Sequence, residues 1–436
     1  MPISSNVFQA LIGFVFLGLI AFCFSENKKK IDWRLILSAF ILQNVLFLLI
    51  SYVPFIHSIL SGISSVIVNL LGYANDGAEF VFGSMVDQKK NGFIFGLVVF
   101  PTIIFFGGLV GIFYFFGIIQ RVITALAFLL RKTLRLSGVE SLVLIADIFL
   151  GQAEGPMVIG PYIGGMTRSQ LACAFIAGLA NISGSTLGMY LSFLGGNDPV
   201  QLHLFANYLV TASFMNTASA IIFAKILFPE TAPTCESSKH VVKVSAEISE
   251  NFLDSLFQGA IKGLKIAATI LAALIMAIAL THMIDGILNW LGNVINVNKG
   301  ISLATDGVFN GLSIEYILGQ LFRIFAFFMG INWAETLKVG SLLGQKVAIN
   351  EFVAYMSLGH MKAIHAISEN SIFISTFALA SFSNLSSIGI SLGSYNVLAP
   401  GRSSELSSIA FKCLFGAVLA GFMTATVAGF WHHLLG

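Results

Sequence analysis

Long apolar stretches separated by short polar segments run through the whole chain. A helix needs about 20 apolar residues to span the hydrocarbon core of a membrane, and several stretches approach or exceed that length without a polar break. They are Val7–Phe24, Leu35–Phe55, Phe93–Phe116, Leu202–Phe228, Ala260–Leu291 and Ile409–Trp431. The first has no basic segment before it and no cleavage site after it, so we expect a retained helix rather than a signal peptide.

Two further apolar stretches are interrupted near their centres by polar residues and turn formers. Glu140–Arg168 is broken at Gly151–Pro156, and Trp333–Met356 is broken near Asn350 and Glu351. A break inside the bilayer leaves backbone groups unpaired, which is tolerated only where the break is packed in protein or lines a cavity. We therefore predict two re-entrant helical hairpins.

Two more spans carry similar pentads at their centres. The pentads are Ala180–Gly184 within Leu171–Leu194 and Ser383–Ser387 within Ser371–Leu392. Each follows a hairpin that contains a glutamate, Glu154 in the first and Glu351 in the second. The two hairpins are predicted to enter the membrane from opposite sides. Paired broken segments in inverted repeats indicate a secondary transporter with its site near the membrane midplane.

Basic residues predict the orientation of these segments. Lys28–Lys30 and Arg34 follow the first span, and Ile119–Leu134 is an amphipathic segment with arginines on its polar face. Basic residues at helix ends remain cytoplasmic, and a basic amphipathic helix lies at the membrane interface. Both termini are therefore predicted outside. Ser58–Gly92, with one short apolar segment, is also expected outside, and Pro229–Asp254 is expected in the cytoplasm.

Composition agrees with a membrane protein and excludes other classes. The chain has 436 residues, of which 56% are hydrophobic and only 10% are charged, whereas a soluble domain carries about 25% charged residues. This excludes a soluble enzyme, a nucleic-acid-binding protein and a disordered scaffold. Four separated cysteines without a CxxC spacing indicate neither a disulfide framework nor a zinc site.

The hairpin glutamates are the first candidates for function, because a carboxylate at bilayer depth is costly unless it faces the interior of the bundle. Glu154 and Glu351 either pair with a lysine or backbone amide and hold the hairpins together, or face a polar cavity. Such a cavity would be shared with Gln152, Asn384, Ser386 and Ser387. This set holds no lysine or arginine, so it favours a neutral, hydroxyl- or amide-rich solute. Phe382 either lends an aromatic face to a ring or is ordinary packing.

Asp147 is a second candidate, in the first half of the first hairpin. It either caps a helix or binds an ion together with Asn181 and Ser183. Lys225, at the inner end of its span, is expected to extend to the cytoplasmic interface. Metal-ligand spacing, phosphate-binding glycine loops and nucleophile elbows are absent from the sequence.

At these motifs the chain resembles the concentrative nucleoside transporter family in its compact bacterial form. The resemblance runs from about Lys28 to Gly429 and is densest in a few motifs. They are Gly151–Glu154, Ala224–Thr231, Asn350–Tyr355, Phe382–Ile390 and Phe422–Ala425. It implies an all-α inner-membrane protein with eight transmembrane helices and two opposed hairpins in an inverted repeat. It also implies a homotrimer that imports one nucleoside with a coupled cation, by an elevator-like motion.

The resemblance also implies the site residues. Gln152, Ala153, Glu154 and Thr186 match the positions that face the nucleobase, and Glu351, Phe382, Asn384 and Ser387 match those around the ribose. Asp147, Leu150, Asn181 and Ile182 match the cation site, which takes Na⁺ or a proton. Ala153 stands where the family has serine or threonine, and Thr186 where valine is usual. Asp147 replaces an asparagine and Asn181 a serine or threonine; the acid favours proton coupling slightly, while sodium binding or a helix cap stay open.

The expected domains are N-terminal scaffold helices (residues 1–137), a first repeat (138–230), a loop with a scaffold span (231–311) and a second repeat (312–436). Two rivals to nucleoside symport are kept. One is a symporter of the same fold for another neutral solute. The other is an intramembrane enzyme that uses Glu154 and Glu351 as acid and base, although no nucleophile or metal motif accompanies them. A channel is disfavoured, because neither hairpin carries a ring of carbonyls or charges.

Overall fold

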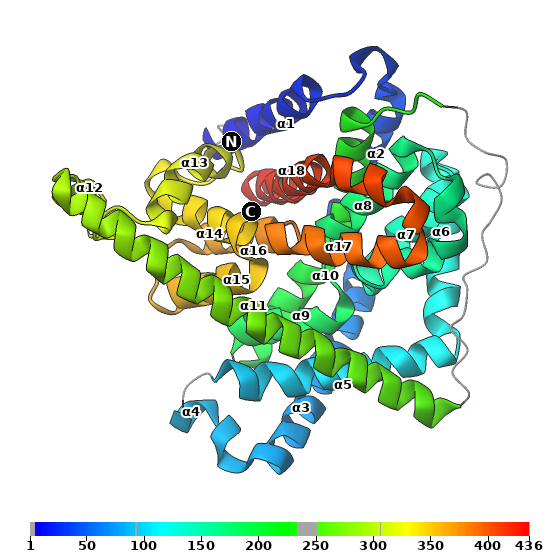
Figure 1. The fold of residues 1–436 in the computed structure, drawn as a ribbon, viewed down its shortest axis with the longest axis horizontal. Helices are drawn as coiled ribbons and strands as arrows, with labels where there is room; N and C mark the ends of the chain where they lie inside the picture. Colours follow the sequence, from blue (N-terminus) through cyan, green and yellow to red (C-terminus); the bar gives the residue numbers. More distant parts are fainter. Residues whose placement is uncertain (1–4, 92–93, 197, 233–250, 306, 436) are drawn as a thin grey trace.

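The computed structural model describes residues 5–91, 94–196, 198–232, 251–305 and 307–435. Within these ranges every regular element is a helix, which confirms the predicted all-α class. The first and last described segments lie near each other (Figure 1), since Asn6 and His433 both lie beside Gly330. The polar part of the predicted cytoplasmic loop at 233–250 lies outside the described residues.

Six long helices correspond to the six uninterrupted stretches. They are α1 (Ser5–Cys23), α2 (Trp33–Tyr52), α5 (Phe95–Phe115), α10 (Pro199–Leu227), α11 (Phe252–Val294) and α18 (Ser403–Leu435). Each is long and apolar enough to cross a membrane. At 43 residues, α11 is longer than predicted. It begins directly after Asn251, whose side chain accepts a hydrogen bond from the Asp254 amide and caps the helix.

The segment after α2 differs from the prediction of one short apolar segment. α3 (Pro54–Phe82) is a single helix of 29 residues, followed by η2 (Gly83–Val86) and α4 (Gln88–Asn91). Pro54 occupies the first turn, where its missing N–H costs nothing, and Gly83 ends the helix with a φ of 61°. The polar residues Asn75 and Asp76 lie inside the helix and do not interrupt it, so this segment too is long enough to cross a membrane.

The remaining elements fall into two groups along the chain, one between α5 and α10 and one between α11 and α18. The first holds α6 (Ile118–Leu134), α7 (Gly138–Phe149), η3 (Gly155–Gly165), α8 (Arg168–Ala180) and α9 (Gly184–Gly195). The second holds α12 (Asn298–Ala304), α13 (Ile314–Phe328), η5 (Trp333–Glu335), α14 (Thr336–Ala348), α15 (Glu351–Ala363), α16 (Glu369–Leu379), α17 (Leu385–Leu398) and η6 (Pro400–Arg402). A short turn, η1 (Lys28–Lys30), joins α1 to α2.

The hairpins and the breaks appear where the sequence predicted them, with different arms. The first hairpin pairs α7 with η3, a run of 3₁₀ turns, because Pro156, Gly160 and Pro161 prevent a regular α-helix. The second pairs α14 with α15, which continues to Ala363 rather than ending at Met356. α8 and α9 are separated at Asn181–Ser183, and α16 and α17 at Ala380–Asn384.

Close packing joins α5 to α11, the helices that precede the two repeats. A methyl group on Gly259 would lie 2.4 Å from the carbonyl oxygen of Gly107, and one on Gly111 would lie 2.4 Å from that of Ser255. Small residues four apart allow two helix backbones to approach closely in a membrane. α10 and α18 form the centre of the bundle, with 89% of each spanning window buried.

Lys225 does not extend to the interface as the sequence predicted. It is buried near the end of α10, where its ammonium group donates to Glu140 of α7 and to the Ser169 hydroxyl at 3.0 Å. A buried charge is stable only when it is paired and hydrogen-bonded. The Glu140–Lys225 ion pair therefore ties the first hairpin to the central helix.

Candidate substrate and cation site

The tip of the first hairpin packs against the broken centres of both repeats. Gly151 has a φ of 74°, a left-handed conformation that favours glycine. A side chain there would also collide, since a methyl group would lie 2.8 Å from Cβ of Ser183 and 3.2 Å from the Phe382 ring. Gly151 therefore lets the hairpin tip reach both α8–α9 and α16–α17.

The two helix breaks contact each other directly. The Phe382 backbone N–H donates to the Asn181 carbonyl oxygen at 3.2 Å, and the buried Asn216 amide of α10 donates to the Ala380 carbonyl oxygen. These bonds satisfy backbone groups that the breaks leave without helical partners. The unwound segments of opposite repeats thus meet in the interior of the bundle.

Gln152 links the first hairpin to the second repeat. Its amide nitrogen donates to the Ser387 hydroxyl at 3.0 Å, and the Ser391 hydroxyl donates to its amide oxygen at 3.2 Å. All three side chains are buried. The sequence predicted that Gln152 and Ser387 share one cavity, and the structure brings them into contact; Ser391 was not predicted.

Glu351 starts α15 and holds two hydrogen bonds from different repeats. The Asn384 amide donates to one carboxylate oxygen at 2.6 Å, and the Tyr190 hydroxyl of α9 donates to the other at 3.2 Å. The Asn384 side-chain oxygen also caps α17 by accepting from the Ser387 amide. Tyr190 was missed by the sequence analysis, because a lone tyrosine in an apolar span carries no pattern.

The other predicted substrate-site residues lie around the hydrogen-bonded cluster of Gln152, Ser387, Asn384 and Glu351. Ala153 and Glu154 are half-buried at the hairpin tip, where Glu154 has an interaction with other residues. Thr186, near the start of α9, lies 3.1 Å from the Ser183 hydroxyl and donates to the Ser183 carbonyl oxygen at 3.0 Å. The Phe382 ring is buried against the hairpin tip.

Asp147 is fully buried in α7, and its two carboxylate oxygens accept no hydrogen bond from the described residues. A methyl group on Gly155 would lie 1.8 Å from one oxygen, so only glycine fits beside it. Ser137 caps α7 instead, so the helix-cap interpretation of Asp147 is wrong. A buried, unpartnered carboxylate needs a ligand, a proton or a water.

The surroundings of Asp147 supply further polar groups. Asn181 is fully buried and donates to the Thr217 hydroxyl and the Ala177 carbonyl oxygen, each at 3.3 Å, while its own side-chain oxygen accepts no hydrogen bond from the part of the chain that the structure describes. The Tyr395 hydroxyl is also buried without a hydrogen-bond partner in the described structure and interacts electrostatically with Asp147. Leu150 and Ile182 are also buried; Leu150 directly follows α7, and Ile182 lies in the break between α8 and α9.

Lys346 adds a basic side chain to the surroundings of Glu351, outside the set of residues that the sequence singled out. It is fully buried in α14, donates to the Ala378 carbonyl oxygen at 2.7 Å and interacts electrostatically with Glu351. No sequence pattern marked Lys346, since one lysine in an apolar arm is also compatible with an interfacial position.

This arrangement suits a neutral polar solute and a small cation. Carboxamides, hydroxyls and one carboxylate from both repeats converge at the breaks, and their mutual hydrogen bonds can be exchanged for bonds to sugar hydroxyls or a ring edge. Oxygen ligands are those that hard cations prefer. Within the described residues, no group of three or more His, Cys, Asp or Glu side chains could hold a metal ion.

Known proteins are similar to almost the whole of this chain. Residues 208–429 match the "Na+ dependent nucleoside transporter C-terminus" family, residues 12–85 match its N-terminal counterpart, and residues 96–197 match the Gate domain described as "Nucleoside recognition". The nucleoside permease NupC of Helicobacter pylori is 33% identical over 436 residues, covering 98% of both chains.

Solved structures agree as well. The fold is similar to the protein CNTnw in an inward-facing, substrate-bound state, with a TM-score of 0.88, 34% identity and coverage of 99% of both chains. A variant of the same protein in an outward-facing state has a TM-score of 0.88, 33% identity and the same coverage.

Proposed function

Because the chain belongs to the concentrative nucleoside transporter family, we propose that it is a symporter that imports nucleosides with a cation across the bacterial inner membrane. The observation that carries this proposal is the cluster of Gln152, Ser387, Asn384 and Glu351, in which the polar side chains of two repeats meet at their helix breaks. The activity of the family is transport, and we propose no enzymatic activity for this chain.

Within this cluster the two ends of a nucleoside have different partners. Gln152, Ala153, Glu154 and Thr186 would face the nucleobase, whose ring edge matches an amide and a carboxylate. Glu351, Asn384 and Ser387 would hold the ribose hydroxyls, with the Phe382 ring beside the sugar. The Glu351 carboxylate supports this assignment, because a charged acceptor makes the stronger hydrogen bond to a hydroxyl.

Asp147, Leu150, Asn181 and Ile182 would form the cation site. The unpartnered Asp147 carboxylate and the free side-chain oxygen of Asn181 support it. Two titratable side chains, Tyr395 of α17 and Cys173 of α8, interact electrostatically with Asp147. We propose a proton as the coupling ion, taken up by Asp147; sodium bound to the ionised carboxylate is the alternative, and the family description supports it.

Movement of the site would follow an elevator-like, alternating-access mechanism in a homotrimer. Inward-facing and outward-facing structures of a similar protein support two end states. The basic ends of α1 and α6 support a cytoplasmic position for that end of the bundle, with both termini outside. Light scattering of the purified protein tests the trimer, because a monomeric mass in detergent and in lipid would contradict it.

Competition for uptake tests the substrate class. Cells that express the chain should accumulate labelled uridine or adenosine, and unlabelled nucleosides should compete while sugars, nucleobases and amino acids should not. If another neutral solute competed and nucleosides did not, the chain would be a symporter of the same fold with a different substrate. Release of free base and sugar by the purified protein would overturn transport as its activity.

A further inference from the structure

Lys346 occupies in the second repeat the position that Asp147 occupies in the first. Each is the third residue from the end of the first hairpin arm, α14 or α7. Each also lies five residues before the hairpin residue of the polar cluster, Glu351 or Gln152. The inverted repeats therefore place a buried base and a buried acid at equivalent sites.

Both side chains reach the end of the broken helix in their own repeat. A methyl group on Gly178, near the end of α8, would lie 3.7 Å from Asp147 Oδ2. The Lys346 ammonium group donates to the carbonyl oxygen of Ala378, near the end of α16, at 2.7 Å. The carboxyl end of a helix carries unpaired carbonyl oxygens and a partial negative charge that favour a cation.

Two further groups surround the Lys346 ammonium with negative potential. Glu351 is the nearest acid along the chain and interacts with it electrostatically, and the face of the Phe422 ring lies 5.9 Å away. In transporters with inverted repeats, such half-helix ends coordinate the coupling ions. A tethered ammonium group satisfies the same carbonyl without any ion from solution.

We infer that Lys346 acts as a built-in cation at the second repeat, so that a single external cation, bound at Asp147, accompanies each nucleoside. This inference rests on the proposed symport function. Lys346 is a positioning residue: its charge holds the Ala378 carbonyl and the Glu351 carboxylate in place for the ribose.

The charge carried per nucleoside tests the inference on the unaltered protein. Purified full-length transporter in proteoliposomes should move one positive charge with each labelled nucleoside, measured from the voltage at which net uptake reverses. Two charges per nucleoside would overturn the inference and leave symport intact. Absence of any nucleoside uptake would instead overturn the proposed function.

Variants of Lys346 give a second test. With Lys346→Met, nucleoside binding should weaken at least tenfold at low salt and recover as sodium or lithium rises, because a free cation can refill the vacated position. Lys346→Arg, the matched control, should keep the charge and need no added cation. Parent-like affinity and cation dependence in Lys346→Met would contradict the inference.

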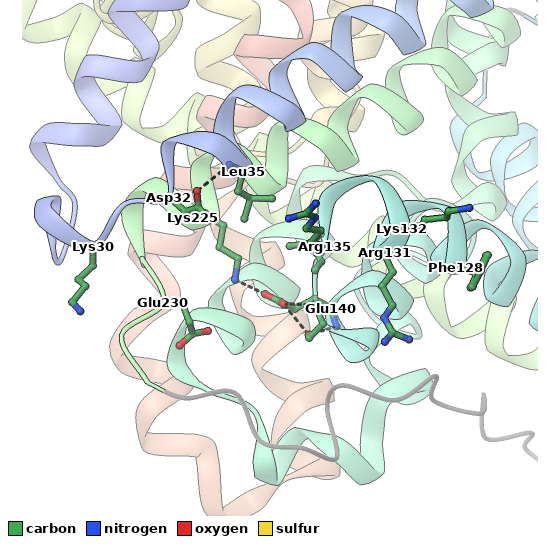
Figure 2. A pocket seen from close by; sticks show the side chains of 12 residues that line it. Lys30, Asp32, Leu35, Phe128, Arg131, Lys132, Arg135, Glu140, Lys225 and Glu230 are labelled. Carbon is green, nitrogen blue, oxygen red and sulfur yellow. Dashed lines mark hydrogen bonds and ion pairs between the residues drawn. The ribbon is translucent and has the colours of Figure 1, made fainter.

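A different observation points to a second site, at the basic end of the bundle. A cavity of about 970 Å³ opens between the start of α2, the end of α6 and the start of α7 (Figure 2). Its lining includes Lys30, Phe128, Arg131, Lys132 and Arg135. The volume is in the range of small-molecule sites.

Each acid that lines this cavity already has an ion-pair or hydrogen-bond partner in the protein. Glu140 is paired with Lys225, and Asp32 accepts from backbone amides at the start of α2. Glu230 accepts a hydrogen bond from the Thr167 hydroxyl at 2.7 Å. The cavity therefore presents an excess of positive charge at its mouth.

Three of its basic residues form no ion pair within the part of the chain that the structure describes: Lys30, Lys132 and Arg135. Arg135 ends α6 with a φ of 56°, at a position where glycine is the usual residue. Arg135 is exposed, and Figure 2 shows it among the residues that line the cavity, together with Glu140 and Lys225.

We propose that this cavity binds the phosphate of an anionic phospholipid headgroup. Phe128 and Leu129, on the same helix, are more than half exposed, and an amphipathic helix lies at the depth where headgroups meet acyl chains. Basic pockets between helices on the cytoplasmic side of a membrane suit anionic headgroups. The exposed apolar side chains favour a lipid over free phosphate.

Retention of phosphatidylglycerol by the purified transporter tests this site, by native mass spectrometry with phosphatidylcholine as the neutral lipid. Lys132→Ala combined with Arg135→Ala should weaken phosphatidylglycerol binding about thirtyfold, the effect of two basic contacts at an anionic surface. Arg121→Ala, on α6 but outside the cavity, should leave it unchanged. Equal losses in both variants, or displacement of the lipid by millimolar inorganic phosphate, would overturn the proposal.

Discussion

At the residue scale, the Glu351 carboxylate is the group on which most of the polar cluster depends. It accepts from Asn384 and Tyr190 in a fully buried setting, where a hydrogen bond to a charged group contributes about 1.5–3 kcal/mol. Glu351→Gln should therefore lower the uptake of every nucleoside by about 10- to 150-fold, with little dependence on the base. Initial rates for a purine and a pyrimidine nucleoside check this.

Tyr190→Phe provides a graded comparison for Glu351. It removes one of the two donors to the carboxylate and should lower uptake in the same base-independent way, by less than Glu351→Gln. Tyr208→Phe is the control, because the structure describes ring contacts but no hydrogen bond for the Tyr208 hydroxyl. A change in base preference in Glu351→Gln would reverse the proposed orientation of the nucleoside.

Ala153 is the position at which base preference should respond. It lies half-buried beside Gln152 at the hairpin tip, and its methyl group offers no hydrogen bond to a ring edge. Ala153→Ser adds a hydroxyl and should change the ratio of pyrimidine to purine uptake by a few-fold, about the value of one net hydrogen bond. If Ala153→Ser and the parent took up pyrimidine and purine nucleosides in the same ratio, residue 153 would not face the base.

The sequence predicted those site residues that carry a local pattern. Gln152, Glu351 and Asn384 stand out because polar residues at helix breaks are costly in a bilayer and so mark function. Tyr190, Lys346 and Tyr395 were missed, because each is an isolated residue in an apolar helix. Their roles come from contacts between repeats, which are far apart in the sequence.

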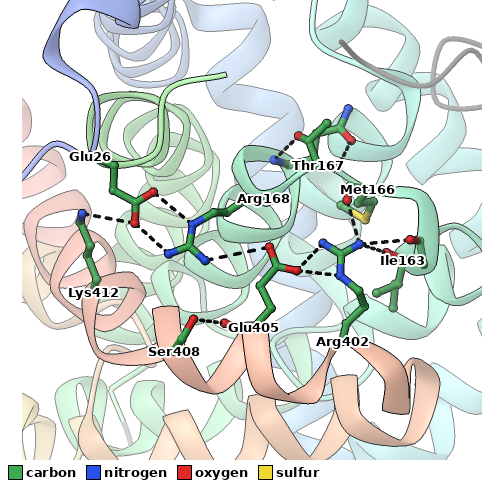
Figure 3. Close-up of polar contacts among 11 residues, drawn as sticks. Glu26, Ile163, Met166, Thr167, Arg168, Arg402, Glu405, Ser408 and Lys412 are labelled. Atoms are coloured by element: carbon green, nitrogen blue, oxygen red, sulfur yellow. Dashed lines mark hydrogen bonds and ion pairs between the residues drawn. The ribbon is translucent and has the colours of Figure 1, made fainter. Parts of the chain in front are cut away.

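At the element scale, a network of ion pairs fastens the basic end of the bundle (Figure 3). Arg168, at the start of α8, makes two hydrogen bonds to Glu26 after α1, at 2.9 and 3.1 Å. Lys412 of α18 lies 3.6 Å from the same carboxylate. Arg402 of η6 donates to carbonyl oxygens at the end of η3, including that of Met166 at 2.8 Å. The junction between η3 and α8 is therefore tied to η6 and, through Glu26, to Lys412 of α18.

This network predicts a pH dependence of stability. Hydrogen bonds from Arg168 lower the pKa of Glu26 below its ordinary value of 4.5. A carboxylate with a depressed pKa stabilises the fold above the unfolded-state pKa, and this contribution is lost as the pH falls through the folded-state pKa. Glu26→Gln should lower the Tm at pH 7, by an amount that corresponds to at most about 1 kcal/mol because the pair is partly exposed.

The difference between the parent and Glu26→Gln should shrink as the pH falls through the lowered folded-state pKa of Glu26, and disappear below it, where both side chains are neutral. Glu79→Gln, an exposed acid of α3 outside any described ion pair, is the control and should match the parent throughout. A Tm difference that stays constant from pH 7 to pH 3 would mean that the charge of Glu26 contributes nothing.

Elements were predictable where the sequence contains a recognisable helix break or helix cap. Asn350 and Asn384 cap α15 and α17, so the second hairpin and the second broken span could be recognised. The extent of α3 and the existence of α13 could not be predicted, because exposed polar residues such as Asn75 are tolerated inside a long helix. The 3₁₀ form of η3 follows from prolines whose effect depends on packing.

At the scale of the whole molecule, the glycine contact between α5 and α11 joins the helices that flank the repeats. Gly259→Ala would place a methyl group 2.4 Å from the Gly107 carbonyl oxygen, and overpacking of this kind costs about 1–3 kcal/mol. The Tm in detergent should fall by several degrees. Gly286→Ala, on the same helix with open space around it, should not lower it; equal Tm values for the two variants would contradict the contact.

Cation-driven nucleoside uptake by the purified chain distinguishes symport from passive transport. Proteoliposomes that contain only the purified chain should accumulate labelled uridine or adenosine above equilibrium when an inward cation gradient is imposed, and should not when the gradient is absent. With sodium and pH gradients applied separately, we expect proton-driven uptake that Asp147→Asn abolishes. If uptake depended strictly on sodium, sodium rather than a proton would be the coupling ion at the Asp147 site. Uptake that only equilibrates under both gradients would contradict symport.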